Sequence, residues 1–200
     1  MGCHGSRGMA CASIMAIVAA AGAFATSARA QSLTALPLRQ GEITFAMRAT
    51  KVNDFVGRVT ALRAEYSGGD LGTVRGNLEL RVADMHTGIG LRDRHMRNAM
   101  RADSFPTIRF ELVGVDAGGT RGDTVSVVFQ GHLTIHGATK TVRVPGTVVM
   151  RQGGVDVSAS IQIDMREYGI DPPTRFLGAI RVLPVTAVTA NLSFGGPEGR

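Results

Sequence analysis

Two histidines four residues apart, His132 and His136, are the clearest candidates for metal ligands in this sequence. They fall in a segment with the alternation of a strand, where such residues share a face but lie about 13 Å apart. One ion cannot bind both, and both belong to the polar side, so we interpret them as surface histidines. The cysteines, Cys3 and Cys11, lie near the start and leave the rest without thiolate ligands or disulfides. The sequence predicts no metal site and no cofactor.

A charged cluster, Arg92-Asp93-Arg94-His95, could bind an anionic head group. Arginine offers paired donors that match a phosphate or a carboxylate. The alternative is a local structural role, in which these side chains pair with one another and hold a short helix in place. We favour the structural role for Asp93 and keep Arg94 and His95 as candidates for contact with a head group.

Catalytic motifs are missing from the sequence. It contains no nucleophile elbow, Ser-His-Asp constellation, phosphate-binding loop or HExxH zinc motif, and its acidic residues are scattered. We therefore assign no catalytic residue and predict that the protein is not an enzyme. An enzyme remains the less favoured alternative.

The elements that must carry these residues are mostly strands, because apolar and polar residues alternate along most of the chain. The alternation predicts eight strands, at residues 42–49, 54–66, 72–83, 107–115, 124–136, 139–150, 155–166 and 180–194. Turn residues separate several of them, at 67–70, 116–119, 137–139 and 152–154. One segment, residues 91–100, has helical spacing instead and predicts a short helix.

Eight antiparallel strands with one apolar face each can form a sandwich or a closed barrel. A closed barrel leaves no exposed edge, and about eight strands enclose room for packed side chains or one slim ligand. We predict an all-β fold, an eight-stranded antiparallel barrel with the helix across one mouth. A membrane barrel is less favoured because the chain has no Trp and two Tyr for interfacial girdles.

The first 30 residues have the pattern of a secretory signal peptide. A basic start at Arg7 precedes an Ala-rich apolar run, and Ala28-Arg29-Ala30 offers a cleavage site. A retained membrane anchor is less favoured because the run is shorter than the roughly 20 residues that span a bilayer. We expect a signal peptide at 1–30, one domain at 31–200 and no membrane span after cleavage. The basic residues of that domain are spread along the chain, which gives no support to nucleic-acid binding.

Four short motifs, in order, resemble those of the YceI-like family. Residues 87–98 resemble its RD-x-HL segment, and residues 104–110 its (F/Y)P-x-I-x-F strand. Residues 131–140 are similar to its G-x-LTI-x-G-x-T hairpin, and residues 166–170 to its R-x-x-(F/Y)-GI motif. The similarity extends over about residues 41–194. It implies a lipocalin-like barrel, exported to the periplasm, that binds a polyisoprenoid or another amphiphile.

The sequence departs from the family pattern in two strands. The family's first strand usually ends with a His. The corresponding residues here, 47–53, contain none. The last strand carries Leu183-Pro184-Val185 where an acidic residue is usual, and Pro184 predicts a bulge or an edge position. Both departures concern the identity of the ligand more than the fold.

The predicted function is binding, with transport or storage, of a polyisoprenoid or other lipid inside a periplasmic barrel. The predicted lining is Ile43, Phe45, Val74, Leu78, Phe110, Val127, Phe129, Leu133, Ile161 and Val188. Two alternatives stay open: a periplasmic stress or interaction protein without lipid, and an enzyme acting on an isoprenoid. The oligomeric state also stays open, a homodimer included.

Overall fold

The computed structural model of the protein describes residues 36–51, 53–175 and 180–195. Its strands are β1 (Leu38–Ala49), β2 (Phe55–Val59), β3 (Leu62–Ser67), β4 (Arg75–Arg81), β5 (Thr107–Arg121), β6 (Thr124–Ile135), β7 (Ala138–Arg151), β8 (Gly154–Asp164), β9 (Thr174–Arg175) and β10 (Ile180–Gly195). Its helices are the 3₁₀ turns η1 (Val82–Asp84) and η2 (Met165–Tyr168) and the α-helix α1 (Gly90–Ala99). The expected helix at 91–100 is thus present, shifted by one residue.

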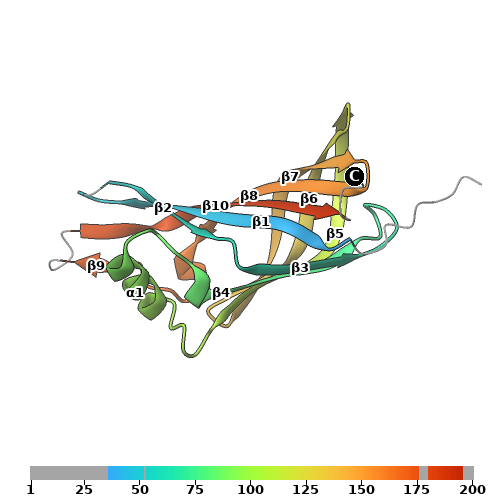
Figure 1. Cartoon of the computed structure of the whole chain (residues 1–200). Coiled ribbons are helices and arrows are strands. Elements are labelled where there is room, and N and C mark those ends of the chain that lie inside the picture. The colour runs from blue at the N-terminus through green and yellow to red at the C-terminus, as the bar shows by residue number, and fades with distance from the viewer. Residues whose placement is uncertain (1–35, 52, 176–179, 196–200) are drawn as a thin grey trace, which may run out of the picture.

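The strands form one curled antiparallel sheet in the order β2-β1-β10-β8-β7-β6-β5-β4-β3, with the short β9 beside β10. The two ends of this order, β2 and β3, are separated in sequence by only Thr60 and Ala61. They act as one bent strand, whose first half pairs with β1 and whose second half pairs with β4. The sheet therefore curls back on itself as the predicted eight-stranded barrel (Figure 1).

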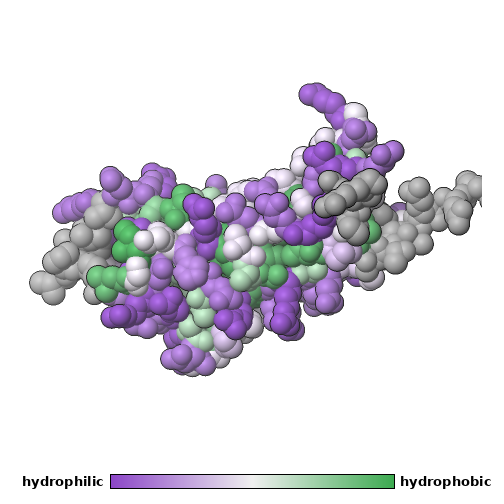
Figure 2. All heavy atoms as spheres, viewed as in Figure 1, coloured by the Kyte–Doolittle hydropathy of each residue, from purple (hydrophilic) through white to green (hydrophobic). Residues whose placement is uncertain are grey.

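A seam runs between the start of β1 and β3. The β1–β2 ladder extends from Ile43 to Met47, and among the described residues no ladder joins residues 38–42 to β3. Leu62 covers part of the seam, because its side chain lies over Gly41 of β1. Figure 2 shows apolar atoms at the surface along this line, between hydrophilic side chains.

Two of the expected turns lie elsewhere. The prediction of a turn at residues 116–119 was wrong, because β5 continues to Arg121 and absorbs the glycines in a register shift between Ala117 and Thr120. The chain reverses at residues 122–123 instead. The next hairpin turns at His136 and Gly137, one residue before the expected position, and both have positive φ, 51° and 78°. Such angles are those of the tight turns that suit the twist of a hairpin.

The bulge expected at Pro184 is confirmed. β10 faces β1 with Val182 opposite Ala49 and Thr186 opposite Met47, so β10 has two extra residues in this stretch. Pro184 lies there, where it does not have to donate a ladder hydrogen bond.

The helix α1 lies at one end of the barrel, close to β9 and to the start of β10, and the loop between β3 and β4 lies at the other end (Figure 1). Buried side chains from the strands, η1 and η2 form the main core, which includes Val59, Val82 and Tyr168, and Met96 of α1 packs against it. None of the helices in the described part of the chain has the length and apolar character needed to cross a membrane.

Candidate functional site

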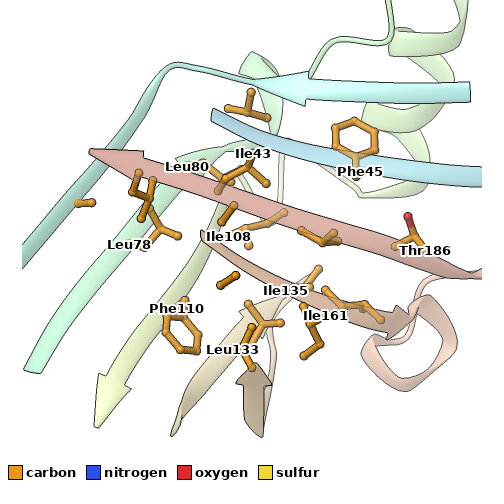
Figure 3. A pocket seen from close by; sticks show the side chains of 18 of the residues that line it. Ile43, Phe45, Leu78, Leu80, Ile108, Phe110, Leu133, Ile135, Ile161 and Thr186 are labelled. Atoms are coloured by element: carbon orange, nitrogen blue, oxygen red, sulfur yellow. The ribbon is translucent and has the colours of Figure 1, made fainter. Parts of the chain in front are cut away.

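A cavity of about 530 Å³ occupies the interior of the barrel. Its wall is built from the inward-facing residues of the strands, and α1 and η2 contribute at one end. The side chains labelled in Figure 3 come from β1, β4, β5, β6, β8 and β10 and point into one common space. The volume lies within the roughly 300–1,000 Å³ of typical small-molecule sites. The barrel is therefore hollow and large enough for a ligand.

Nine of the ten residues proposed as lining lie at the wall of this cavity. They are Ile43, Phe45, Val74, Leu78, Phe110, Phe129, Leu133, Ile161 and Val188. Other wall residues were missed, among them Leu80, Ile108, Ile135, Ile163 and Met96. The strand members of this second set continue the same alternation of period two, so the signal that would have found them was present in the sequence.

Val127 is the exception among the predicted lining residues. It is 3% exposed and packs with Val115 and Val148 in a separate core cluster. It is not among the residues that line the cavity. Val127 was expected to contact the lumen. The side chains of this cluster surround it instead.

Glycines beside phenylalanine rings leave space for those rings along the wall of the lumen. Phe45 lies directly across from Gly57 in the β1–β2 ladder. A Cβ atom at Gly57 would lie 2.1 Å from Cζ of Phe45, so the ring occupies the space that a side chain would fill. Gly131 provides similar space for Phe110 and Gly146 for Phe129. Each ring lies against the wall instead of projecting across the barrel, an arrangement known as aromatic rescue of glycine.

The wall has few polar residues, and the buried Thr186 among them has a hydrogen-bond partner. Thr186 is 7% exposed, and its hydroxyl donates to the backbone carbonyl of Ala46 at 2.9 Å. Its hydroxyl therefore leaves no unpaired polar atom at the cavity. The enclosed hydroxyl of Tyr66 has no hydrogen-bond partner within the described part of the chain.

The helix α1 places Arg92 and His95 at the wall, together with Met96. The guanidinium carbon of Arg92 lies 4.2 Å from the ring centroid of Phe55, an inward-facing residue of β2. Arg94, which the sequence suggested for the head group, is exposed on the helix and is not part of the wall. Leu91 also differs from expectation, because it is 60% exposed although it belongs to the helical apolar pattern.

Asp93 anchors α1 to the preceding loop. Its side chain is buried, and Oδ1 accepts hydrogen bonds from the backbone N–H and the hydroxyl of Thr87, at 2.8 and 2.6 Å. His86 Nδ1 lies 3.6 Å from Oδ2. Burial raises the pKa of Asp93, but the hydrogen bonds from Thr87 and the nearby His86 outweigh it and hold that pKa below its ordinary value.

A known family model covers the strands of the barrel and α1. The family model of the YceI-like domain matches residues 35–194. The chain belongs to the YceI-like family. A comparison with curated proteins finds no match.

Solved structures share the fold of this YceI-like domain at low sequence identity. BcnA of Burkholderia cenocepacia is 16% identical, with a TM-score of 0.63 and coverage of 76% of this chain and 95% of that one. A polyisoprenoid binding domain from Saccharophagus degradans, implicated in plant cell wall breakdown, is 16% identical, with a TM-score of 0.64 and coverage of 80% and 97%. The YCEI protein of Campylobacter jejuni is 13% identical, with a TM-score of 0.60 and coverage of 74% and 88%.

The histidines of this YceI-like domain are not arranged as a metal site. His132 lies on β6, whereas His136 lies in the following turn, where Nδ1 is 3.1 Å from the carbonyl oxygen of Tyr168 and the ring packs on Phe105. The interpretation of His136 as a surface residue was wrong, because the turn folds its ring under η2. Among the described residues, no group of three or more His, Cys, Asp or Glu side chains could hold a metal ion.

Proposed function

We propose that this YceI-like protein binds the chain of an isoprenoid, or of another amphiphilic lipid, inside its barrel. The observation that carries the proposal is the cavity of about 530 Å³ with a wall that is apolar over nearly its whole extent. A long branched hydrocarbon needs such a wall, and each CH₂ group that it buries contributes about 0.8 kcal/mol. The similarity to a polyisoprenoid binding domain supports the same ligand class.

We also propose that the protein acts in the periplasm, where it carries or stores this lipid after cleavage following Ala30. The proposal rests on the sequence of residues 1–30, which lie outside the described residues. Protein isolated from its native host should begin at Gln31 when its N-terminus is sequenced. A full-length product held in the membrane would contradict this compartment.

Filling the lumen tests the binding proposal. Leu133 of β6 is 8% exposed and lies at the wall of the cavity. Leu133→Trp would place a larger side chain in the space of the ligand. Displacing two methylene groups of a bound chain costs about 1.6 kcal/mol, which lowers affinity more than tenfold. Calorimetric titration with geranylgeraniol would measure this loss.

Ser126→Trp is the matched control, because Ser126 is an exposed residue of the same strand. Its affinity for geranylgeraniol should equal that of the unmodified protein. If both folded variants bind equally well, the chain does not enter the barrel. If the unmodified protein neither binds the alcohol nor carries a lipid in native mass spectrometry, an interaction or stress role without lipid replaces the proposal.

A further inference from the structure

The charged residues of the cavity wall are divided between its two ends. Four wall residues carry groups that can be charged: Glu65, Asp70, Arg92 and His95. The two acids belong to β3 and the loop that follows it, whereas the two basic residues belong to α1. Figure 1 shows these elements at opposite ends of the barrel. An amphiphile with a negative head would therefore be attracted to the α1 end and repelled from the β3 end.

Arg92 is the fixed positive charge at the α1 end. Its side chain is half-buried, and its guanidinium carbon lies over the Phe55 ring, 4.2 Å from the ring centroid. A cation–π contact of this kind does not use the N–H donors of the guanidinium as hydrogen-bond donors to an acceptor. The ring thus holds the guanidinium at the mouth of the cavity without satisfying its donors.

Arg92 is one of several arginines that have no counter-ion among the described residues, and it is the one of them that lies at the cavity wall. Within residues 36–51, 53–175 and 180–195, the ion pairs of arginine involve Arg48, Arg81, Arg109, Arg143, Arg151 and Arg166. The nearest acid in sequence, Asp93, is directed to Thr87 and His86 instead. Asp54, next to Phe55, pairs with another arginine: its Oδ2 lies 3.9 Å from Nε of Arg48. A cation beside an apolar cavity, with donors unused and no acid opposite, suits an anionic group brought by a ligand.

We propose that the α1 mouth binds an anionic head group, a phosphate or a carboxylate, through the guanidinium of Arg92. The ligand of this site is then an anionic amphiphile, with its chain in the barrel, its head at α1 and its far end towards β3. His95, one helical turn further along the same wall, borders the head group. Arg94 contributes only the general positive charge of the helix. This inference rests on the proposed binding of a chain in the cavity.

The test compares two ligands that share a chain and differ in the head, geranylgeranyl phosphate and geranylgeraniol. The unmodified protein should bind the phosphate about tenfold more tightly or better, the range expected for charge-assisted hydrogen bonds. Arg92→Gln should abolish this preference, so that the variant binds the phosphate and the alcohol with equal affinity. Arg94→Gln removes the same charge from the same helix and should retain most of the preference. The preference of Arg92→Lys for the phosphate should lie between those of Arg92→Gln and Arg94→Gln, because lysine keeps the charge but lacks the planar fork of donors.

The outcomes separate this inference from the proposed function. Equal affinities for the two ligands in the unmodified protein would overturn the role of Arg92 and leave binding of the chain intact. A loss of preference in Arg94→Gln equal to that in Arg92→Gln would overturn it as well. Inorganic phosphate that competes as well as the lipid phosphate would show a free-anion site instead of a head-group site. Failure to bind either ligand would instead reject the proposed function itself.

Discussion

The space between Phe45 and Gly57 provides a direct test of why the barrel is hollow. Alanine at position 57 would place Cβ 2.1 Å from Cζ and 2.3 Å from Cε2 of Phe45. Carbon atoms in contact prefer a separation of about 3.5–4.0 Å, so the ring has to move by more than about 1 Å. Because the ladder fixes both backbones, the ring can move only towards the lumen. Gly57→Ala should therefore reduce both stability and the space for a ligand.

The magnitude follows from two opposing effects. Overpacking a well-packed site costs about 1–3 kcal/mol, and Phe45 is only 5% exposed. Alanine recovers about 0.5–1 kcal/mol, because it restricts the unfolded chain more than glycine does. We expect a net loss of about 1–2 kcal/mol in the free energy of unfolding, measured by urea denaturation. Affinity for geranylgeraniol should fall as well, in the same titration that tests Leu133→Trp.

Gly114→Ala is the matched control, because Gly114 is also a strand glycine and a Cβ there would meet nothing within 4 Å. It should keep the stability of the original or raise it by up to about 1 kcal/mol, because alanine restricts the unfolded chain and meets no clash there. Replacing Phe45 by Leu in the Gly57→Ala background should recover part of the loss, because the ring that clashes is then gone. The reasoning is refuted if Gly57→Ala is as stable as Gly114→Ala and binds the alcohol with unchanged affinity.

The strands could be predicted from the sequence because the alternation of period two is a local property. The prediction overlooked the break in residues 54–66, which the structure divides into β2 and β3. Phe55 and Val59 face inward at odd positions, whereas Leu62 and Tyr66 do so at even positions, so the parity changes at Thr60-Ala61. That change was visible in the sequence and marks the point where the strand passes from β1 to β4.

The state of the lumen was harder to predict, because it depends on pairs of residues from different strands. Nothing local indicates that Gly57 faces Phe45, and only the register of the ladder brings them together. Which of Arg92 and Arg94 faces the cavity, by contrast, depends on a local pattern. Arg92, Met96 and Ala99 follow the spacing of one helical face, and all three lie at the cavity wall. Helical phase would have selected Arg92.

Two further predictions concern Asp93. Asp93→Ala leaves the N–H and hydroxyl of Thr87 without their acceptor, and it should lower the free energy of unfolding by about 1–3 kcal/mol in urea denaturation. A change near zero would show that the carboxylate of Asp93 does not stabilise the fold. The second prediction is that this difference depends on pH, because the pKa of Asp93 is lower in the folded protein than its ordinary value. A carboxylate with a lowered pKa stabilises the fold above its unfolded pKa, about 3.9, and loses this contribution as the pH falls through the folded pKa. The gap between the original protein and Asp93→Ala should thus stay constant from pH 7 to about 5 and shrink below about pH 4. A gap that persists unchanged at pH 2 would show that Asp93 acts through its packing and not through its charge.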